Sequence, residues 1–122
     1  MNELNTIESA VLKKLLEGSH PVLEALNSQL DNCQVKKREL TGVGFFTEMD
    51  ISPSVSKAPV SSKKIYFGDV IAEVEGLKNG IGFLLYIVDG QIQMLEGYTF
   101  DEPWPDIIKH MELKFTSQSR DF

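Results

Sequence analysis

The feature that most constrains the fold of this chain is the dipeptide Asp89-Gly90, which stands between two segments rich in apolar residues. A two-residue turn of type I′ needs positive φ at both central positions, and Asp-Gly is among the sequences that adopt it most readily. The flanking segments, 81–88 and 91–100, have the length and the β-branched and aromatic content of strands. The sequence therefore predicts an antiparallel β-hairpin.

The turn also predicts a register, because each residue before it faces its mirror-image partner after it. Four pairs are expected on the face that meets the core: Ile87 with Ile92, Leu85 with Met94, Phe83 with Glu96, and Ile81 with Tyr98. On the other face the expected pairs are Tyr86 with Gln93 and Leu84 with Leu95. That second face is half apolar, so we expect a helix or a partner to cover part of it.

Two amphipathic helices are predicted before the strands. Apolar residues recur at helical spacing in the first of them, at Leu4, Ile7, Val11 and Leu15. Asn5 and Glu8 form a predicted capping pair, and Gly18 is a natural end for this helix. Pro21 suits the first turn of a second helix that runs to about Asp31.

Alternation and β-branched content predict further strands at 35–41, 43–51, 69–75 and 111–115. Segment 52–64 contains five Ser and two Pro and is predicted to be a mobile loop inside one sheet. The expected fold class is α+β, with two N-terminal helices packed on a mostly antiparallel sheet of about five to six strands. At 122 residues we expect a single domain, 1–122.

Acidic residues are concentrated in one third of the chain. The formal net charge is −6, and residues 65–106 alone carry −7, with eight acidic side chains against Lys78. Such a field repels nucleic acid, whose phosphates require clustered Lys and Arg, and it favours a basic protein partner. A solvated acidic surface without a partner is the simpler interpretation.

Other features bear on the compartment. The longest apolar-rich run, 81–88, is too short to span a bilayer, and the N-terminal segment lacks the basic and apolar regions of a secretory signal. Cys33 is the only cysteine, so an intrachain disulfide is impossible, and it is interpreted as a small residue at a helix-to-strand junction. We expect a cytoplasmic protein without membrane association.

The segment 101–105 is the first candidate binding surface. Trp104 is the only tryptophan, two prolines stiffen its neighbourhood, and Asp101 and Glu102 precede it. An aromatic anchor ringed by charge is typical of a protein interface, with Glu73 and Glu75 contributing to electrostatic steering. The alternative is a tryptophan folded back over the end of the core.

Glu96 is the second candidate, because the predicted register places its carboxylate on the apolar face. With Glu48 or Asp69 as a second carboxylate it would form a carboxylate site in a small ligand-binding protein or enzyme; the alternative is a structural Glu bonded to backbone amides or a lysine. Neither a catalytic triad nor a metal or cofactor motif is present, so no catalytic residue, metal or cofactor is predicted. A homodimer through the face of Leu84 and Leu95 is a third hypothesis.

Two segments resemble a known group of proteins: LTGVGFFT at 40–47 and GIGFLLYIVDGQIQMLEGYTFDEPWP at 80–105. They are similar to small, uncharacterised single-domain bacterial proteins, a group that resembles the immunity proteins paired with secreted toxins. The resemblance implies a cytoplasmic α+β protein that acts by binding, for example as an inhibitor of a basic toxin. It implies no catalytic residue.

Overall fold

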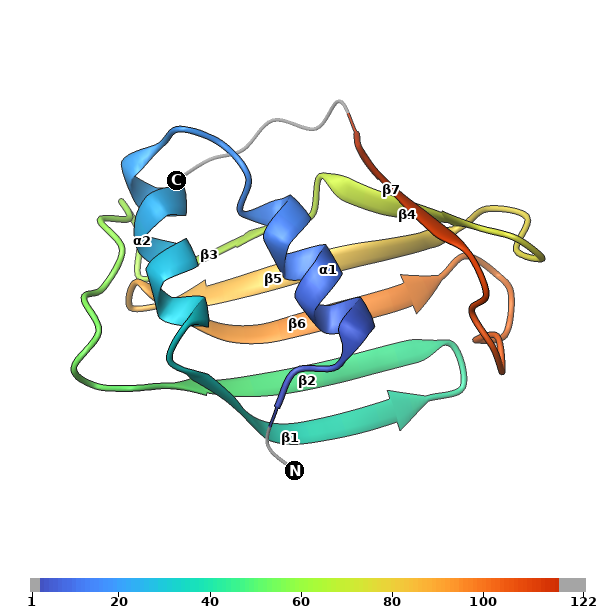
Figure 1. Ribbon diagram of the computed structural model, residues 1–122, viewed down its shortest axis with the longest axis horizontal. Coiled ribbons are helices and arrows are strands. Elements are labelled where there is room, and N and C mark those ends of the chain that lie inside the picture. Colours follow the sequence, from blue (N-terminus) through green and yellow to red (C-terminus); the bar gives the residue numbers. More distant parts are fainter. Residues whose placement is uncertain (1–2, 117–122) are drawn as a thin grey trace.

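Two helices lie across one face of an antiparallel β-sheet in the computed structural model, which describes residues 3–116 (Figure 1). The helices are α1 (Thr6–Leu15) and α2 (Pro21–Leu30). The strands are β1 (Cys33–Thr41), β2 (Gly44–Ile51), β3 (Lys64–Phe67), β4 (Val70–Val74), β5 (Ile81–Val88), β6 (Gln91–Thr99) and β7 (Met111–Phe115). Their order across the sheet is β1-β2-β6-β5-β4-β7, and β3 pairs with the end of β5 that β4 leaves free. The expected α+β class with N-terminal helices is confirmed, with seven strands instead of five to six.

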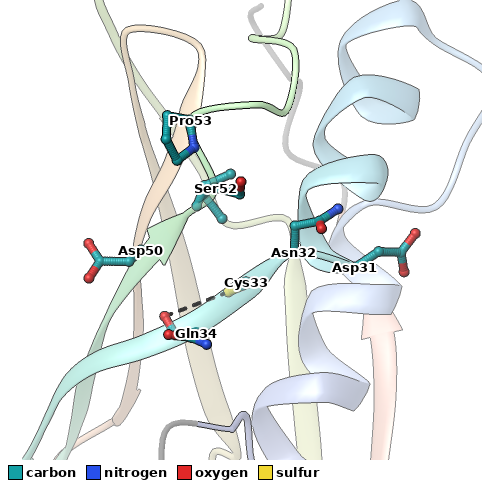
Figure 2. A pocket seen from close by; sticks show the side chains of 8 residues that line it. Asp31, Asn32, Cys33, Gln34, Asp50, Ser52 and Pro53 are labelled. Atoms are coloured by element: carbon teal, nitrogen blue, oxygen red, sulfur yellow. Dashed lines mark hydrogen bonds between the residues drawn. The ribbon is translucent and has the colours of Figure 1, made fainter.

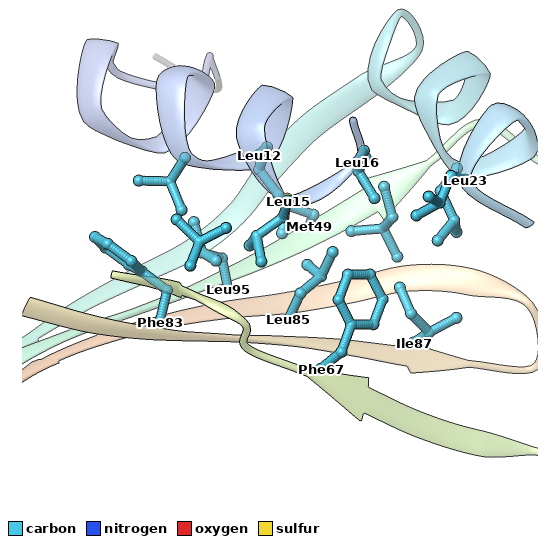
Figure 3. Packing of buried hydrophobic residues seen from close by; sticks show 14 of the residues in the cluster. Leu12, Leu15, Leu16, Leu23, Met49, Phe67, Phe83, Leu85, Ile87 and Leu95 are labelled. Carbon is cyan, nitrogen blue, oxygen red and sulfur yellow. The ribbon is translucent and has the colours of Figure 1, made fainter. Parts of the chain in front are cut away.

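Both helices begin where the sequence predicts, but α1 ends at Leu15, before the predicted end at Gly18. Asn5 and Glu8 make a reciprocal capping box at the start of α1, and Pro21 is the first residue of α2. The apolar faces of both helices pack on the sheet, as Figure 3 shows. The labelled residues in that core are Leu12, Leu15, Leu16, Leu23, Met49, Phe67, Phe83, Leu85, Ile87 and Leu95.

The additional strand is β3, which begins at Lys64, the last residue of the segment predicted as a loop. It forms because Ile65 and Phe67 are buried in the core while Lys64 and Tyr66 remain exposed. The preceding loop is also anchored: Ala58 is only 6% exposed, and its amide donates a hydrogen bond to the Gly90 carbonyl oxygen at 2.8 Å. The chain between β2 and β3 is therefore held against the β5–β6 turn.

The predicted register of the β5–β6 hairpin is correct only next to the turn. Val88 pairs with Gln91 and Ile87 with Ile92, but the next pair is Tyr86 with Met94, so Gln93 is an extra residue on β6. This β-bulge shifts every later pair by one position, and a shift of one residue moves a side chain to the opposite face. The pairs that replace the predicted ones are Leu85 with Leu95, Leu84 with Glu96, Phe83 with Gly97, Gly82 with Tyr98 and Ile81 with Thr99.

The bulge overturns the predicted position of Glu96. Its carboxylate does not lie on the core face opposite Phe83; it lies with Leu84 on the face of the sheet opposite the helices. Leu95, predicted on that outer face, is instead fully buried in the core. We call the outer surface the open face and define it by the half-buried residues Phe46, Glu48, Leu84, Tyr86, Met94, Glu96 and Tyr98. Neither α1 nor α2 covers it (Figure 1).

A buried carboxylate fastens α1 to the other face of the sheet. Glu8 is 1% exposed and accepts hydrogen bonds from Arg38 at 2.6 and 2.8 Å, from the Asn5 amide at 2.8 Å and from the Thr47 hydroxyl. Burial by itself raises the pKa of this carboxyl, but the hydrogen bonds from Arg38, Thr47 and Asn5 and the charge of Arg38 outweigh it, so the pKa is lowered.

Gln29 fastens α2 in a similar way. Its side chain is fully buried; the amide nitrogen donates to the Gly90 oxygen at 2.9 Å and the Ser56 oxygen at 3.2 Å, and its oxygen accepts from the Ile92 amide at 2.9 Å. One side chain thus joins α2, the chain between β2 and β3, and the β5–β6 turn.

We expect Gln29→Leu to lower the free energy of unfolding by about 2–4 kcal/mol, because it leaves the buried Ile92 amide without its hydrogen-bond acceptor. Urea denaturation followed by circular dichroism measures the change. Ser28→Ala, at the exposed neighbouring position, is the control and is expected to change it by less than about 0.5 kcal/mol. Equal stability of Gln29→Leu and the wild type would contradict the role of Gln29.

The lowered pKa of Glu8 predicts a pH dependence of stability. A group whose pKa is lower in the folded state stabilises the fold above its unfolded pKa, which is about 4.3 for Glu, and this contribution is lost as the pH falls through the folded value. Glu8→Gln should therefore be less stable at pH 7 and lose less stability between pH 5 and pH 3 than the wild type, as measured by urea denaturation across that range. Glu24→Gln, which removes an exposed carboxylate, is the matched change; an identical effect of both variants would refute the assignment to Glu8.

Candidate functional site

Two of the residues predicted at a partner interface, Glu102 and Trp104, make structural contacts. The carboxylate of Glu102 accepts hydrogen bonds from the backbone amides of Lys78, at 2.9 Å, and Asn79, at 3.2 Å. It therefore ties the chain after β6 to the turn between β4 and β5. The ring of Trp104 packs edge-on against Phe45, with centroids 5.5 Å apart, and joins the partly buried border of the core. This packing agrees with the alternative in which the tryptophan closes the end of the core.

The other predicted interface residues are exposed. Glu73 forms an ion pair with Lys114 at 3.0 Å on neighbouring strands β4 and β7, and Glu75 follows the end of β4. Asp101 directly follows Phe100, and the backbone of Asp101 has a left-handed conformation with a φ of 57°. An interface role for these acidic residues stays a prediction.

Two of the three candidate carboxylates share the open face. On β2, Glu48 is paired with Met94 of β6, and Phe46 is paired with Glu96 of β6. Glu48 and Glu96 are therefore diagonal neighbours on adjacent strands, a position in which Cα atoms lie about 7–8 Å apart. Asp69 is 7% exposed and lies in the connection between β3 and β4, beyond β5. The structure therefore brings Glu48 and Glu96 together and leaves Asp69 outside their pair.

Aromatic side chains surround Glu96. The Tyr86 hydroxyl donates a hydrogen bond to its Oε1 atom at 3.0 Å, and the Tyr66 ring lies 6.1 Å from that of Tyr86. Tyr98, two residues along β6, packs over Gly82, where a Cβ atom would come within 2.6 Å of its ring. Gly82 thus leaves room on β5 for the ring of Tyr98.

The tyrosines remain hydrogen-bond donors at neutral pH. Burial raises the pKa of Tyr86, and the hydrogen bond to Glu96 and its negative charge raise it further. Burial also raises the pKa of Tyr98, with the charge of Glu96 adding to it. Phenols that keep their protons beside a carboxylate form a polar group suited to recognition, because Tyr86 fixes the orientation of the carboxylate.

A hollow opens on the open face beside this cluster. It has a volume of about 350 Å³ and is lined by Lys37, Glu39, Phe46, Glu48 and Met94. The walls combine an aromatic ring, a thioether side chain, the ammonium group of Lys37 and two carboxylates, so their formal charge is negative by one. This combination suits a side chain that carries both apolar surface and positive charge.

Another hollow, of about 690 Å³, lies where α2 passes into β1 and includes Cys33 (Figure 2). Burial raises the pKa of the Cys33 thiol to about 11, and the charges of Glu8 and Asp50 contribute. A thiol with such a pKa is protonated at neutral pH and is a poor nucleophile. Cys33 begins β1 just after α2, as predicted for a small residue at that junction.

Sequence reasoning missed Phe46, Met94 and Tyr98 as members of one surface. The signal for Phe46 was its alternation with the buried Phe45 and Thr47 along β2. For Met94 and Tyr98, the bulge at Gln93 reverses the face that the turn predicts.

Residues 3–116 contain no helix with the length and apolar character needed to cross a membrane. No group of three or more His, Cys, Asp or Glu side chains in that range is arranged to hold a metal ion. Comparison of the chain with protein-family models, curated proteins and solved structures gives no match.

The proximity of Glu96 to Tyr98 predicts a change in a titration. In Glu96→Gln the pKa of Tyr98 should fall, because the negative charge that helps to raise it is gone, yet stay above the ordinary value because burial remains. NMR titration of the tyrosine ring carbons measures the pKa of Tyr98 in the wild type and in Glu96→Gln. Glu112→Gln removes a carboxylate from edge strand β7 and should leave the Tyr98 curve unchanged; an unchanged curve in Glu96→Gln itself would contradict the geometry.

Proposed function

We propose that this protein is a non-catalytic protein-binding module that binds a basic protein partner through the open face. The observation that carries the proposal is the composition of that face: five half-buried apolar or aromatic side chains surround Glu96 on a sheet that neither helix covers there. Contiguous apolar surface of this kind, interrupted by a few polar groups, is typical of interaction sites.

The charge of the chain favours a basic partner over a second copy. The net charge is −6, and Glu48 and Glu96 both lie on the open face. Two copies meeting face to face would bring these carboxylates together and would have to desolvate like charges. A partner with positive charge and apolar side chains would complement the same surface, and the excess of acidic residues would speed its approach.

An inhibitor of a basic toxin is the kind of binding protein that fits this surface. The resemblance of 40–47 and 80–105 to immunity-like proteins supports this kind of function, and the second segment contains both β5 and β6 of the open face. The acidic residues predicted earlier, Glu73, Glu75 and Asp101, would then act in steering, outside the central contact.

The alternative is a small ligand-binding protein or enzyme that uses Glu96 and Glu48. Their diagonal pairing on the open face favours it. Against it, the hollow beside them is lined mainly by long flexible side chains on an open sheet surface, whereas small-molecule sites are usually concave and largely enclosed. We therefore prefer protein binding.

The test compares two variants that each add one positive charge. Met94→Arg places a cation in the middle of the open face, and Ser28→Arg places one on the exposed side of α2. With immobilised protein and host lysate, we expect wild type and Ser28→Arg to retain the same basic protein, and Met94→Arg to lose it, because charge and bulk block the contact. Purified partner then gives the dissociation constants by calorimetry.

Circular dichroism and urea denaturation establish that both variants are folded. Equal retention of the basic partner by Met94→Arg and wild type would refute binding through the open face. A dimer in sedimentation at low micromolar concentration that Met94→Arg converts to a monomer would assign the face to a second copy and would also refute the proposal.

A further inference from the structure

We propose that the cluster around Glu96 is a recognition site for a single arginine side chain, with the guanidinium bound by the Glu96 carboxylate between the rings of Phe46 and Tyr98. This inference rests on the proposed function, because it names the chemical group of the basic partner that the open face binds. It deepens that proposal at one position on the sheet.

The carboxylate of Glu96 has capacity for a cation. Tyr86 donates to Oε1 at 3.0 Å, and among residues 3–116 no Lys or Arg forms an ion pair with Glu96. A carboxylate offers about four lone-pair sites, so it can accept two parallel bonds from a guanidinium while keeping the bond from Tyr86. Tyr86 also fixes the direction of the carboxylate before any ligand arrives.

Apolar groups lie on all sides of this carboxylate. Phe46 is directly opposite on β2 and Leu84 directly opposite on β5, while Met94 and Tyr98 lie on the same face of β6. Directly opposite residues have Cβ atoms about 4.5–5.5 Å apart, so the Phe46 ring is within contact distance of a group bound to Glu96. An ion pair in such surroundings is less screened by water than one at an exposed edge.

The aromatic rings select for arginine over lysine. A guanidinium is planar, stacks on aromatic faces and is more weakly hydrated than an ammonium group, so less free energy is lost when it leaves water. The ring of Tyr98 packs over Gly82, and Tyr98 lies two residues from Glu96 on the same face of β6, where the charge of Glu96 contributes to its raised pKa. The hollow of about 350 Å³ next to Phe46 and Met94 leaves space for the residue that follows the arginine in a partner.

The chain itself contains a precedent for this pairing on the helix-covered side of the sheet. Arg38 binds the Glu8 carboxylate through two hydrogen bonds, and the Thr47 hydroxyl completes its coordination. At Glu96 the Tyr86 hydroxyl occupies the corresponding role, but no arginine or lysine among residues 3–116 forms an ion pair with this carboxylate. Among residues 3–116, Glu8 is therefore paired with an arginine and Glu96 is not.

The experiment titrates ¹⁵N-labelled full-length protein with N-acetyl-arginine amide, using N-acetyl-lysine amide and N-acetyl-citrulline amide as comparisons. We expect arginine to shift the amide signals of Phe46, Met94, Glu96 and Tyr98 with a millimolar dissociation constant, lysine to bind at least about threefold more weakly, and citrulline to cause no saturable shift. Glu96→Gln should weaken arginine binding about tenfold or more, and Tyr86→Phe by a smaller factor.

Glu112→Gln is the matched control, because it removes one carboxylate from the same face of the sheet at strand β7, which lies three strand spacings, about 14 Å, from β6. Arginine binding that persists in Glu112→Gln and is lost in Glu96→Gln supports the site. Equal binding of arginine and citrulline, no shift at these residues, or an unchanged constant in Glu96→Gln overturns it. If Met94→Arg loses the protein partner but arginine amide shifts no signal of the wild type, the arginine site alone is refuted. If arginine amide shifts the expected signals but Met94→Arg still retains the partner, the proposed interface is refuted.

Discussion

The bulge at Gln93 determines which side chains of the central sheet meet the helices and which meet the surroundings. Without the extra residue, continuous pairing from the turn would place Met94, Glu96 and Tyr98 on the core face and send Leu95 outward. The observed pairing instead buries Leu95 between β6 and the helices and places the carboxylate outside. A core containing Glu96 would have to bury its charge beside Phe83, and the cost of that burial favours the bulged register.

Much of the architecture was predictable because local signals decide it. The spacing of apolar residues, the N-cap at Asn5 and the proline at the first position of α2 predict both helices, and Asp89-Gly90 predicts the hairpin. A bulge leaves no comparable mark: counting from a turn assumes one residue opposite one, so the face of Glu96 was predicted incorrectly. Strand β3 was missed because its four residues become a strand only by pairing with β5.

Long-range contacts account for the rest of what the sequence did not reveal. Glu8 and Arg38 are thirty positions apart, and Gln29 and Ile92 are sixty-three apart, so neither pair has a local signature. Each places a buried polar side chain between a helix and the sheet, where every hydrogen bond must be made for burial to be tolerated. The two glutamates differ in this respect. Glu8 is buried between a helix and the sheet and is part of the structural framework, whereas Glu96 lies on the open face.

The open face is organised by contacts within itself. Tyr66 packs beside Tyr86, Tyr86 donates to Glu96, and Tyr98 lies over Gly82 and packs edge-on against Phe100. These lateral contacts cover part of each apolar side chain in the unbound protein and restrict its rotamers. A surface restricted in this way loses less conformational entropy on binding than one of independently moving side chains, and the stiff aromatic groups supply most of the contact area. The arrangement that keeps the rings ordered in the free protein is therefore the arrangement that would make them effective in a complex.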